Sequence, residues 1–487
     1  MNRLRRLSAH VVRPTTRAGG AGVAAAAAEA PEFDLVIRGG AVIDGTGAPQ
    51  FEADVGVRGG TIAAVGPGLG KGAREIDAGG MLVCPGFVDV HSHFDGQATW
   101  DDLLAPSVWH GVTTTIFGNC GVGFAPVRPG REAAEYLLDL MEGVEDIPGS
   151  VLDEGLEWGA WETFGQYLDH LETVPRTMDV GCLVPHGCVR TYVMGERGGD
   201  HFERPTEPEL EEMRAVVCAA LEAGAFGIST ARTVKHFAAD GRPTPGKSAA
   251  WPELAAIADG MRDAGRGVIE VGTDFEEGER EILRDMAARS GRPMSALVLQ
   301  ITGASDRWQD TLAWIDAANR DGLRFSGQVG TRPIGLMMGL EATIHPFVRH
   351  AAFAEIAGLP LAEKVARLTN DQELRQRLLA ERQWQPGAPW VQPRTTAVGE
   401  EFHEWMDFVM TRLYQLGGGA APSEGRMPAL DYEPPLDTAV AQRAVAAGRE
   451  PYELALELML QDGGRELLMF THENYANGSP AGHLCLT

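Results

Sequence analysis

The feature that most constrains the fold is a regular alternation of short apolar runs and helical patterns, which begins at residue 87. Seven strand-like runs are separated by helical segments, and they lie near residues 87–93, 112–119, 181–186, 225–230, 267–272, 295–301 and 323–329. Strands that alternate with helices form parallel sheets with helical crossovers. The alternation therefore predicts an α/β fold built on a parallel sheet.

The clearest helical pattern follows a capping signal. Thr206 can cap a helix while Glu209 reaches back to it, as in a capping box. Apolar residues then recur at helical spacing until Gly224, a residue typical of helix ends. A second helix is expected from about Pro252 to about Gly265. These helices fill the intervals between the predicted strands.

Composition excludes several classes of protein. The 487 residues carry a formal net charge of −26, which disfavours binding to nucleic acid or to an anionic membrane surface. No apolar stretch reaches the roughly 18 residues that would span a bilayer. Six cysteines in so long a chain do not form a disulfide framework, so a reducing, cytoplasmic location is expected. The Arg- and Ala-rich, acid-free residues 1–28 leave two alternatives open, a mitochondrial or other organelle leader and a disordered extension.

Two histidines are spaced by two at the end of the first predicted strand. In an extended strand, residues two apart point to the same face, so His91 and His93 would aim at one spot. Two converging imidazoles suggest a bound metal ion. The alternative is a buried pair of hydrogen-bonded histidines.

The second predicted strand also ends in a potential ligand. The β-branched run from Gly111 leads to Cys120, whose thiolate can be stabilised by a metal. In parallel α/β folds the carboxyl ends of neighbouring strands meet on one face, where the chemistry collects. The sequence therefore predicts that Cys120 lies close to His91 and His93.

Several stretches resemble the amidohydrolase superfamily, and within it the D-aminoacylases. They read DLVIRGGAVIDGTG from Asp34, PGFVDVHSHFDGQ from Pro85, GVTTTIFGNCGVGFAP from Gly111, VPHGCVR from Val184 and GAFGISTART from Gly224. The resemblance implies a TIM-type (β/α) barrel joined to a small β-sandwich. It also implies that His91, His93 and Cys120 are metal ligands and that the metal is zinc.

The chain divides accordingly into four expected parts. Residues 1–30 would be an extension, and residues 31–86 a small antiparallel β portion with glycine-rich turns. Residues 87–333 would hold barrel strands one to seven. Residues 334–487 would be a mainly helical excursion, read as a lid by resemblance or as a peripheral helical part from the sequence alone.

The chain departs from the family pattern at its carboxyl end and in the middle. The family's eighth strand ends in a metal-binding aspartate, whereas this sequence reads FTHENYANGS and then PAGHLCLT. We therefore expect an incomplete barrel. The fifth and sixth predicted strands also lack the family's histidines. Glu270 or Asp274 could supply an oxygen ligand or take over proton transfer, or both could simply be part of a hydrogen-bonded polar rim.

Four further residues are candidates for the site. His186 ends the third predicted strand and could assist catalysis, with Arg190 four residues later. Arg232 follows the fourth strand and Arg332 the seventh. Each arginine could bind a substrate carboxylate through a two-pronged hydrogen bond, or could lie elsewhere on the surface.

The resemblance implies hydrolysis of the amide bond of N-acyl (D-)amino acids by metal-activated water, with a small molecule as the partner. Many relatives bridge two metals with a carboxylated lysine, but none of the four lysines ends a convincing strand. This argues against a hydantoinase-like or dihydroorotase-like enzyme. Two alternatives remain open: an impaired, truncated barrel that binds a ligand or partner, and a cyclic-amide hydrolase.

Overall fold

The computed structural model describes residues 30–301, 307–387, 400–416 and 431–475. The chain forms two compact units, each with its own core. The first consists of residues 1–88 and 110–114, and the second of residues 89–109 and 115–487. The predicted extension, residues 1–30, lies almost entirely outside the described residues.

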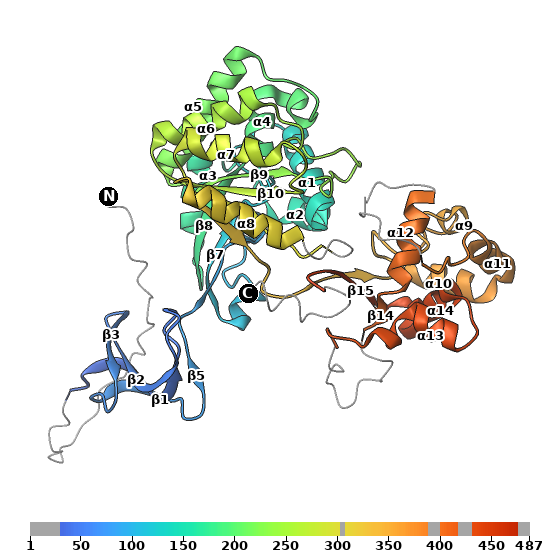
Figure 1. The fold of residues 1–487 in the computed structure, drawn as a ribbon, viewed down its shortest axis with the longest axis horizontal. Helices are drawn as coiled ribbons and strands as arrows, with labels where there is room; N and C mark the ends of the chain where they lie inside the picture. The colour runs from blue at the N-terminus through green and yellow to red at the C-terminus, as the bar shows by residue number, and fades with distance from the viewer. Residues whose placement is uncertain (1–29, 302–306, 388–399, 417–430, 476–487) are drawn as a thin grey trace, which may run out of the picture. The chain divides into compact units, whose positions relative to one another are not determined.

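The first unit is built on a five-stranded sheet (Figure 1). Its strands are β1 (Phe33–Val42), β2 (Phe51–Arg58), β3 (Thr61–Gly66), β4 (Gly72–Asp77) and β5 (Leu82–Val83). The β1–β2 and β2–β3 pairs are antiparallel, but β4 and β5 pair with β1 in parallel. The expectation of a purely antiparallel sheet was therefore wrong. The alternation of apolar and polar residues determines which side chains face the core. It does not determine beside which strand, or in which direction, β4 and β5 pair.

The barrel part is a parallel sheet whose strands follow one another in chain order. They are β6 (Phe87–Asp89), β7 (Val112–Phe117), β8 (Asp179–Pro185), β9 (Gly227–Arg232), β10 (Val268–Thr273), β11 (Met294–Leu297) and β12 (Phe325–Gln328). The register is parallel from β8 to β12. The predicted α/β class and TIM-type barrel wall are confirmed, with seven strands in the part of the chain that the structure describes (Figure 1).

Helices connect these strands. They are α1 (Arg131–Glu145), α2 (Gly149–Gly155), α3 (Phe164–Thr173), α4 (His186–Met194), α5 (Glu207–Ala223), α6 (Trp251–Ala264), α7 (Glu279–Ser290) and α8 (Arg307–Arg320). The capping box of α5 is confirmed, because the Thr206 backbone N–H donates to Glu209 Oε2 at 2.7 Å. Gly224 and Gly265 end α5 and α6 as expected, both at positive φ.

The region after β12 forms a core of its own within the second unit. Its helices are α9 (Ala351–Ala354), α10 (Leu361–Asn370), α11 (Gln372–Ala380), α12 (Glu400–Met410), α13 (Val440–Ala446), α14 (Pro451–Met459) and α15 (Gln461–Gly464). A short 3₁₀ turn lies in this region at Leu436–Thr438, and three others lie in the barrel part, at Gln97–Thr99, Ser107–His110 and Gly195–Gly199. Trp405, Phe402 and Tyr452 are almost completely buried in this core.

This region also contains a three-stranded antiparallel sheet of β13 (Ile334–Met338), β14 (Leu413–Gln415) and β15 (Leu468–Glu473). The run FTHENYANGS begins inside β15. Although it resembles the approach to an eighth barrel strand, β15 pairs with β13 and β14 instead. Residues 476–487, in which the sequence lacks a counterpart of the family's eighth-strand aspartate, lie outside the described residues.

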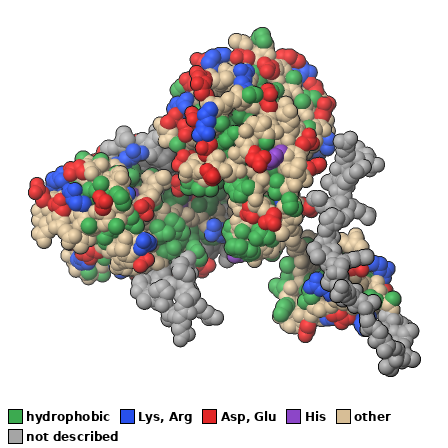
Figure 2. Space-filling model, turned by 180° about the vertical axis from the view of Figure 1, so that it is seen from behind, with side chains coloured by type: hydrophobic (Ala, Val, Ile, Leu, Met, Phe, Trp, Pro, Cys, Tyr) green, Lys and Arg blue, Asp and Glu red, His purple; other side chains and the backbone are tan. Residues whose placement is uncertain are grey.

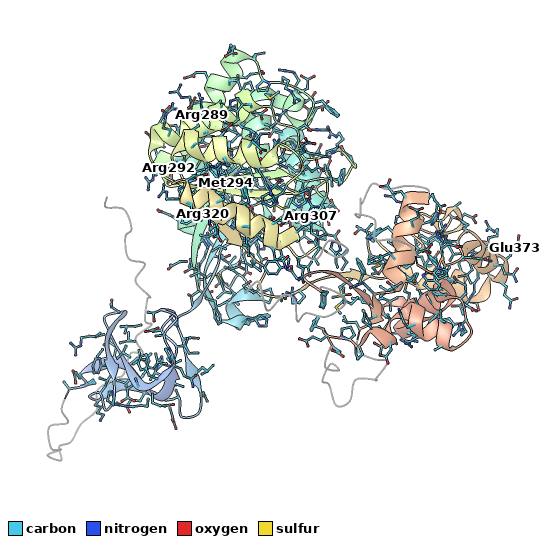
Figure 3. All side chains as sticks on the ribbon, viewed as in Figure 1. Arg289, Arg292, Met294, Arg307, Arg320 and Glu373 are labelled. Carbon is cyan, nitrogen blue, oxygen red and sulfur yellow. The ribbon has the colours of Figure 1, made fainter. Side chains whose placement is uncertain are left out.

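The surface shows no single-sign patch in the view of Figure 2, where acidic and basic side chains are interspersed. Many of them pair with each other, as Arg289 of α7 does with Asp259 of α6 at 2.7 Å (Arg289 is labelled in Figure 3).

Across the described residues, none of the helices combines the length and the apolar character that a membrane crossing requires.

Candidate metal centre

The two histidines lie just beyond β6 rather than within it. The strand ends at Asp89, so the expected strand 87–93 was too long, and its alternation does not by itself align His91 with His93. The segment stays beside β7 because the Ser92 backbone N–H and Oγ both donate to the Ile116 carbonyl, each at 3.0 Å. The imidazole rings nevertheless lie together, with centroids 5.4 Å apart.

Cys120 is presented by an unusual backbone conformation. It has a φ of 55°, which residues other than glycine rarely adopt. Two neighbouring strands hold it there. The Cys120 N–H donates to Glu270 Oε2 at 3.1 Å, and the Gly121 N–H donates to Ser229 Oγ at 2.9 Å. Hydrogen bonds from β10 and β9 therefore fix where the thiol points.

These three side chains converge on one point. One potential ligand atom from each of His91, His93 and Cys120 lies within 4.8 Å of the others. His91 Nε2 is 3.2 Å from Cys120 Sγ. Burial lowers the pKa of His91 and brings that of His93 well below its usual value, which favours the neutral rings that keep a nitrogen lone pair.

The donor set fits zinc. Two imidazoles and a thiolate are ligands that zinc takes, and three protein ligands are typical of catalytic zinc sites. His93 Nδ1 is buried without a hydrogen-bond partner among the described residues, as expected of an atom left for a ligand. Burial raises the pKa of the Cys120 thiol well above its usual value, so a nearby cation would be needed to hold the thiolate.

Two buried carboxyl groups, Asp95 and Glu270, and the partly exposed Glu145 lie near this cluster. Burial raises the pKa of Asp95 to about 7, and those of Glu145 and Glu270 to about 8. Glu270 Oε1 lies 3.7 Å from His91 Nδ1 and has no hydrogen-bond partner in the described part of the chain. Buried acids without a compensating cation are costly, which agrees with a positive ion in their midst.

Two residues at the centre were missed by the sequence analysis. Glu145 Oε1 lies 3.2 Å from His93 Nε2, and Gln328 Oε1 lies 2.9 Å from His91 Nδ1. Gln328 is the last residue of β12, so its place at a strand end was a usable signal. Glu145 ends helix α1, where nothing in the sequence pattern distinguishes it.

His186 and Arg190 belong to a buried ion network at the start of α4. His186 contacts Thr230 Oγ1 through Nδ1 at 2.9 Å and Glu253 Oε1 through Nε2 at 2.8 Å. Arg190 donates to both oxygens of Glu253 and to the carbonyls of Gly198, Asp200 and Glu203. A guanidinium has five N–H donors, so these bonds use all of them. Arg190 is completely buried, and the structure does not offer it to a substrate.

The other predicted residues lie at or near the carboxyl ends of the strands, with different partners. Asp274 accepts from Thr233 Oγ1 at 3.0 Å and from the Val234 N–H at 2.7 Å, so both of its oxygens are engaged. Arg232 forms a two-pronged pair with Glu279 at 2.7 and 2.8 Å. Arg332 is exposed between β12 and β13.

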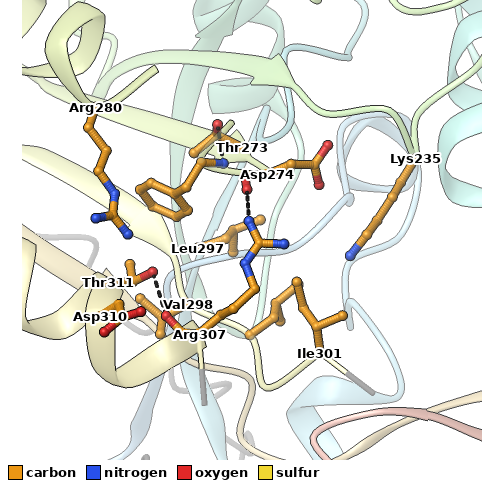
Figure 4. A pocket seen from close by; sticks show the side chains of 12 residues that line it. Lys235, Thr273, Asp274, Arg280, Leu297, Val298, Ile301, Arg307, Asp310 and Thr311 are labelled. Carbon is orange, nitrogen blue, oxygen red and sulfur yellow. Dashed lines mark hydrogen bonds between the residues drawn. The ribbon is translucent and has the colours of Figure 1, made fainter. Parts of the chain in front are cut away.

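A pocket lies beyond the carboxyl ends of β10 and β11 (Figure 4). Arg307 points into it and donates to the Asp274 carbonyl at 2.9 Å. Arg280 contributes a guanidinium that stacks on the rings of Phe275 and Trp314 at 5.9 and 6.0 Å. Its Nε is buried and has no hydrogen-bond partner among the described residues.

Comparison with known proteins places the chain in a family. A D-aminoacylase of Alcaligenes xylosoxydans xylosoxydans is 36% identical over 199 residues, 41% of this chain and 37% of that protein. An uncharacterized protein of Mycobacterium tuberculosis is 33% identical over 285 residues, 55% of this chain and 46% of that protein. This chain thus aligns with less than half the length of either relative. A solved D-aminoacylase has the same fold, with a TM-score of 0.50 and 24% identity, over 90% of this chain and 72% of that one.

The family model that describes the amidohydrolase family matches residues 74–384, well over half of the chain. The match contains all of the strands β6 to β12 and the whole His–His–Cys cluster. The resemblance to D-aminoacylases is confirmed at the level of sequence and fold. The chain belongs to the amidohydrolase family.

Proposed function

We propose that this protein is a zinc-dependent hydrolase of the amide bond in N-acyl amino acids, and that His91, His93 and Cys120 hold the metal. The observation that carries the proposal is the convergence of these three ligand atoms within 4.8 Å. Relatives from Alcaligenes named as deacylases of N-acyl-D-aspartate and N-acyl-D-glutamate support the substrate class.

The chemistry divides between the metal and the chain's own residues. When bound, zinc supplies a Lewis acid that polarises a carbonyl oxygen and lowers the pKa of a coordinated water. The chain must hold that ion, orient the amide and transfer a proton to the leaving amine. The sequence suggests three residues for catalysis: His186, Glu270 and Asp274. The polar atoms of His186 and Asp274 already form hydrogen bonds with other groups of the chain.

Glu270 is the residue that suits proton transfer. One of its oxygens is fixed by the Cys120 N–H, and the other lies beside His91 with no hydrogen-bond partner in the described chain. Burial raises the pKa of Glu270 to about 8, and a general acid or base works best when its pKa lies near the operating pH. We assign His186 and Asp274 structural roles instead.

Replacement of Glu270 by glutamine tests this assignment. The amide keeps the size and the acceptor for the Cys120 N–H but has no acidic proton, so we expect kcat to fall by about 10²- to 10⁴-fold. Zinc content, measured by elemental analysis, should stay at the wild-type level. Asp274→Asn is the matched control. If Asp274→Asn lowers kcat as much as Glu270→Gln does, Glu270 has no special role.

Two arginines are candidates for binding the substrate carboxylate. Arg332 is exposed, and Arg280 lines the pocket beyond β10 and β11 without a carboxylate partner among the described residues. A guanidinium binds a carboxylate through paired, charge-assisted hydrogen bonds. Arg190 and Arg232, by contrast, are already paired with Glu253 and Glu279. We propose Arg280 and Arg332 for this role.

A panel of N-acyl amino acids tests the function. The purified, zinc-loaded chain should release free amino acid from N-acetyl amino acids, measured by amine-specific labelling, and chelation of zinc should stop the release. Methyl esters of the same compounds should be poorer substrates, because they lack the carboxylate. D- and L-forms are assayed in parallel. Bound zinc with no turnover of any compound would favour a ligand-binding protein, and turnover of hydantoins alone would favour a cyclic-amide hydrolase.

A further inference from the structure

Each imidazole of the centre has one ring nitrogen held by an oxygen from a distant part of the chain. In His91, Nε2 lies 3.2 Å from the Cys120 sulfur, while Nδ1 lies 2.9 Å from Gln328 Oε1. In His93, Nε2 lies 3.2 Å from Glu145 Oε1, while Nδ1 is buried and has no hydrogen-bond partner among the described residues. One nitrogen of each ring is thus occupied, and the other is left for the metal.

The occupied nitrogens determine where the protons sit. The Gln328 amide oxygen only accepts hydrogen bonds, and the Glu145 carboxyl likewise only accepts once it is ionised beside a bound cation. The ring nitrogen that faces each of these oxygens then carries the hydrogen. In a neutral imidazole the second nitrogen then has the lone pair. His91 would present the lone pair of Nε2 beside the thiol, and His93 that of Nδ1. A metal requires such a lone pair from each ring.

The two holding residues come from outside the segment that carries the histidines. Gln328 is the last residue of β12, which lies at the opposite edge of the seven-stranded sheet from β6. Glu145 is the last residue of helix α1. The rings are therefore held by residues from two elements, the strand β12 and the helix α1, that the chain places beside the histidines. Such partners typically fix the tautomer and the plane of a metal-binding imidazole.

We propose that Gln328 and Glu145 are positioning residues, which hold His91 and His93 in the tautomer and orientation that a metal requires. This inference rests on the proposed metal centre. It adds two residues that contribute no ligand atom themselves and that act through the histidines. Their removal should weaken zinc binding without removing any ligand.

The test is zinc affinity, measured by competition with a chromogenic chelator on the full-length chain. Gln328→Leu and Glu145→Leu remove the acceptor and are expected to weaken binding by about 10- to 100-fold each. Gln328→Glu and Glu145→Gln retain an acceptor oxygen and should bind zinc nearly as the wild type does. With cobalt in place of zinc, the thiolate-to-metal absorption band should persist in all four variants, because Cys120 is unchanged.

Gln415→Leu is the matched control, since it removes an amide that donates to Gln461 Oε1 at 3.0 Å, in the separate core after β12. It should leave zinc affinity unchanged. Wild-type affinity in both leucine variants would overturn this inference and leave the proposed function standing. Equal weakening in the leucine and the acceptor-retaining variants would also overturn it, because packing would then explain the loss. A wild-type protein that binds no zinc would overturn the proposed function itself.

Discussion

Replacement of Cys120 by alanine is expected to abolish zinc binding and, with it, hydrolysis. The wild-type chain should carry about one zinc ion, because three protein ligands make one site. Removing the sulfur leaves two imidazoles and takes away the only ligand with a negative charge among the three. Elemental analysis of the purified variant should give zinc near the background level, and release of amino acid should fall below detection.

Cys182→Ala provides the control for this experiment. Cys182 is a buried thiol in β8 and, at 3% exposure, is as secluded as Cys120 at 5%. The two variants therefore lose the same atom from equally buried positions. If Cys120→Ala keeps its zinc, or if Cys182→Ala loses its zinc as well, the sulfur is not a ligand. The assigned metal centre would then have to be abandoned.

Replacement of Glu253 by alanine is expected to cause the largest loss of stability. The Glu253 carboxylate is the common partner of His186 and Arg190, and the side chains of all three residues are fully buried. Burial alone would raise the pKa of the Glu253 carboxyl. Hydrogen bonds and charge attraction from His186 and Arg190 outweigh burial and bring this pKa below its usual value. Without the carboxylate, a guanidinium would remain buried and unpaired. Loss of one partner of a buried pair costs about 3–5 kcal/mol.

Urea unfolding of the full chain measures this loss. Glu211→Ala is the control, because the Glu211 side chain is 73% exposed and pairs loosely with Arg214 at 3.4 Å. Loss of an exposed pair typically costs about 0–1 kcal/mol. A double variant, Arg190→Met with Glu253→Met, should recover much of the stability, since both charges are then absent. Equal unfolding free energies for Glu253→Ala and Glu211→Ala would contradict the ion network.

The site could be predicted in part. The sequence placed two histidines and a cysteine after neighbouring strands, and the structure brings their ligand atoms together. It gave no means of distinguishing Arg190 and Arg232, which are paired with carboxylates, from the exposed Arg332, since all three follow strand ends. Arg190 of α4 finds its partner, Glu253 of α6, 63 residues away, and only the tertiary structure decides that.

The sequence by itself located the seven strands, although it made the first and the sixth too long, and it gave the limits of helices such as α5. Strand and helix periodicity, caps and glycines are local signals, and they act over a few residues. The tertiary structure decided the rest: the parallel return of β4 to β1, the departure of β15 from the barrel sheet, and the partners of each imidazole. Gln328 meets His91 across 237 residues of chain, and a contact of that separation is set by how the sheet curls.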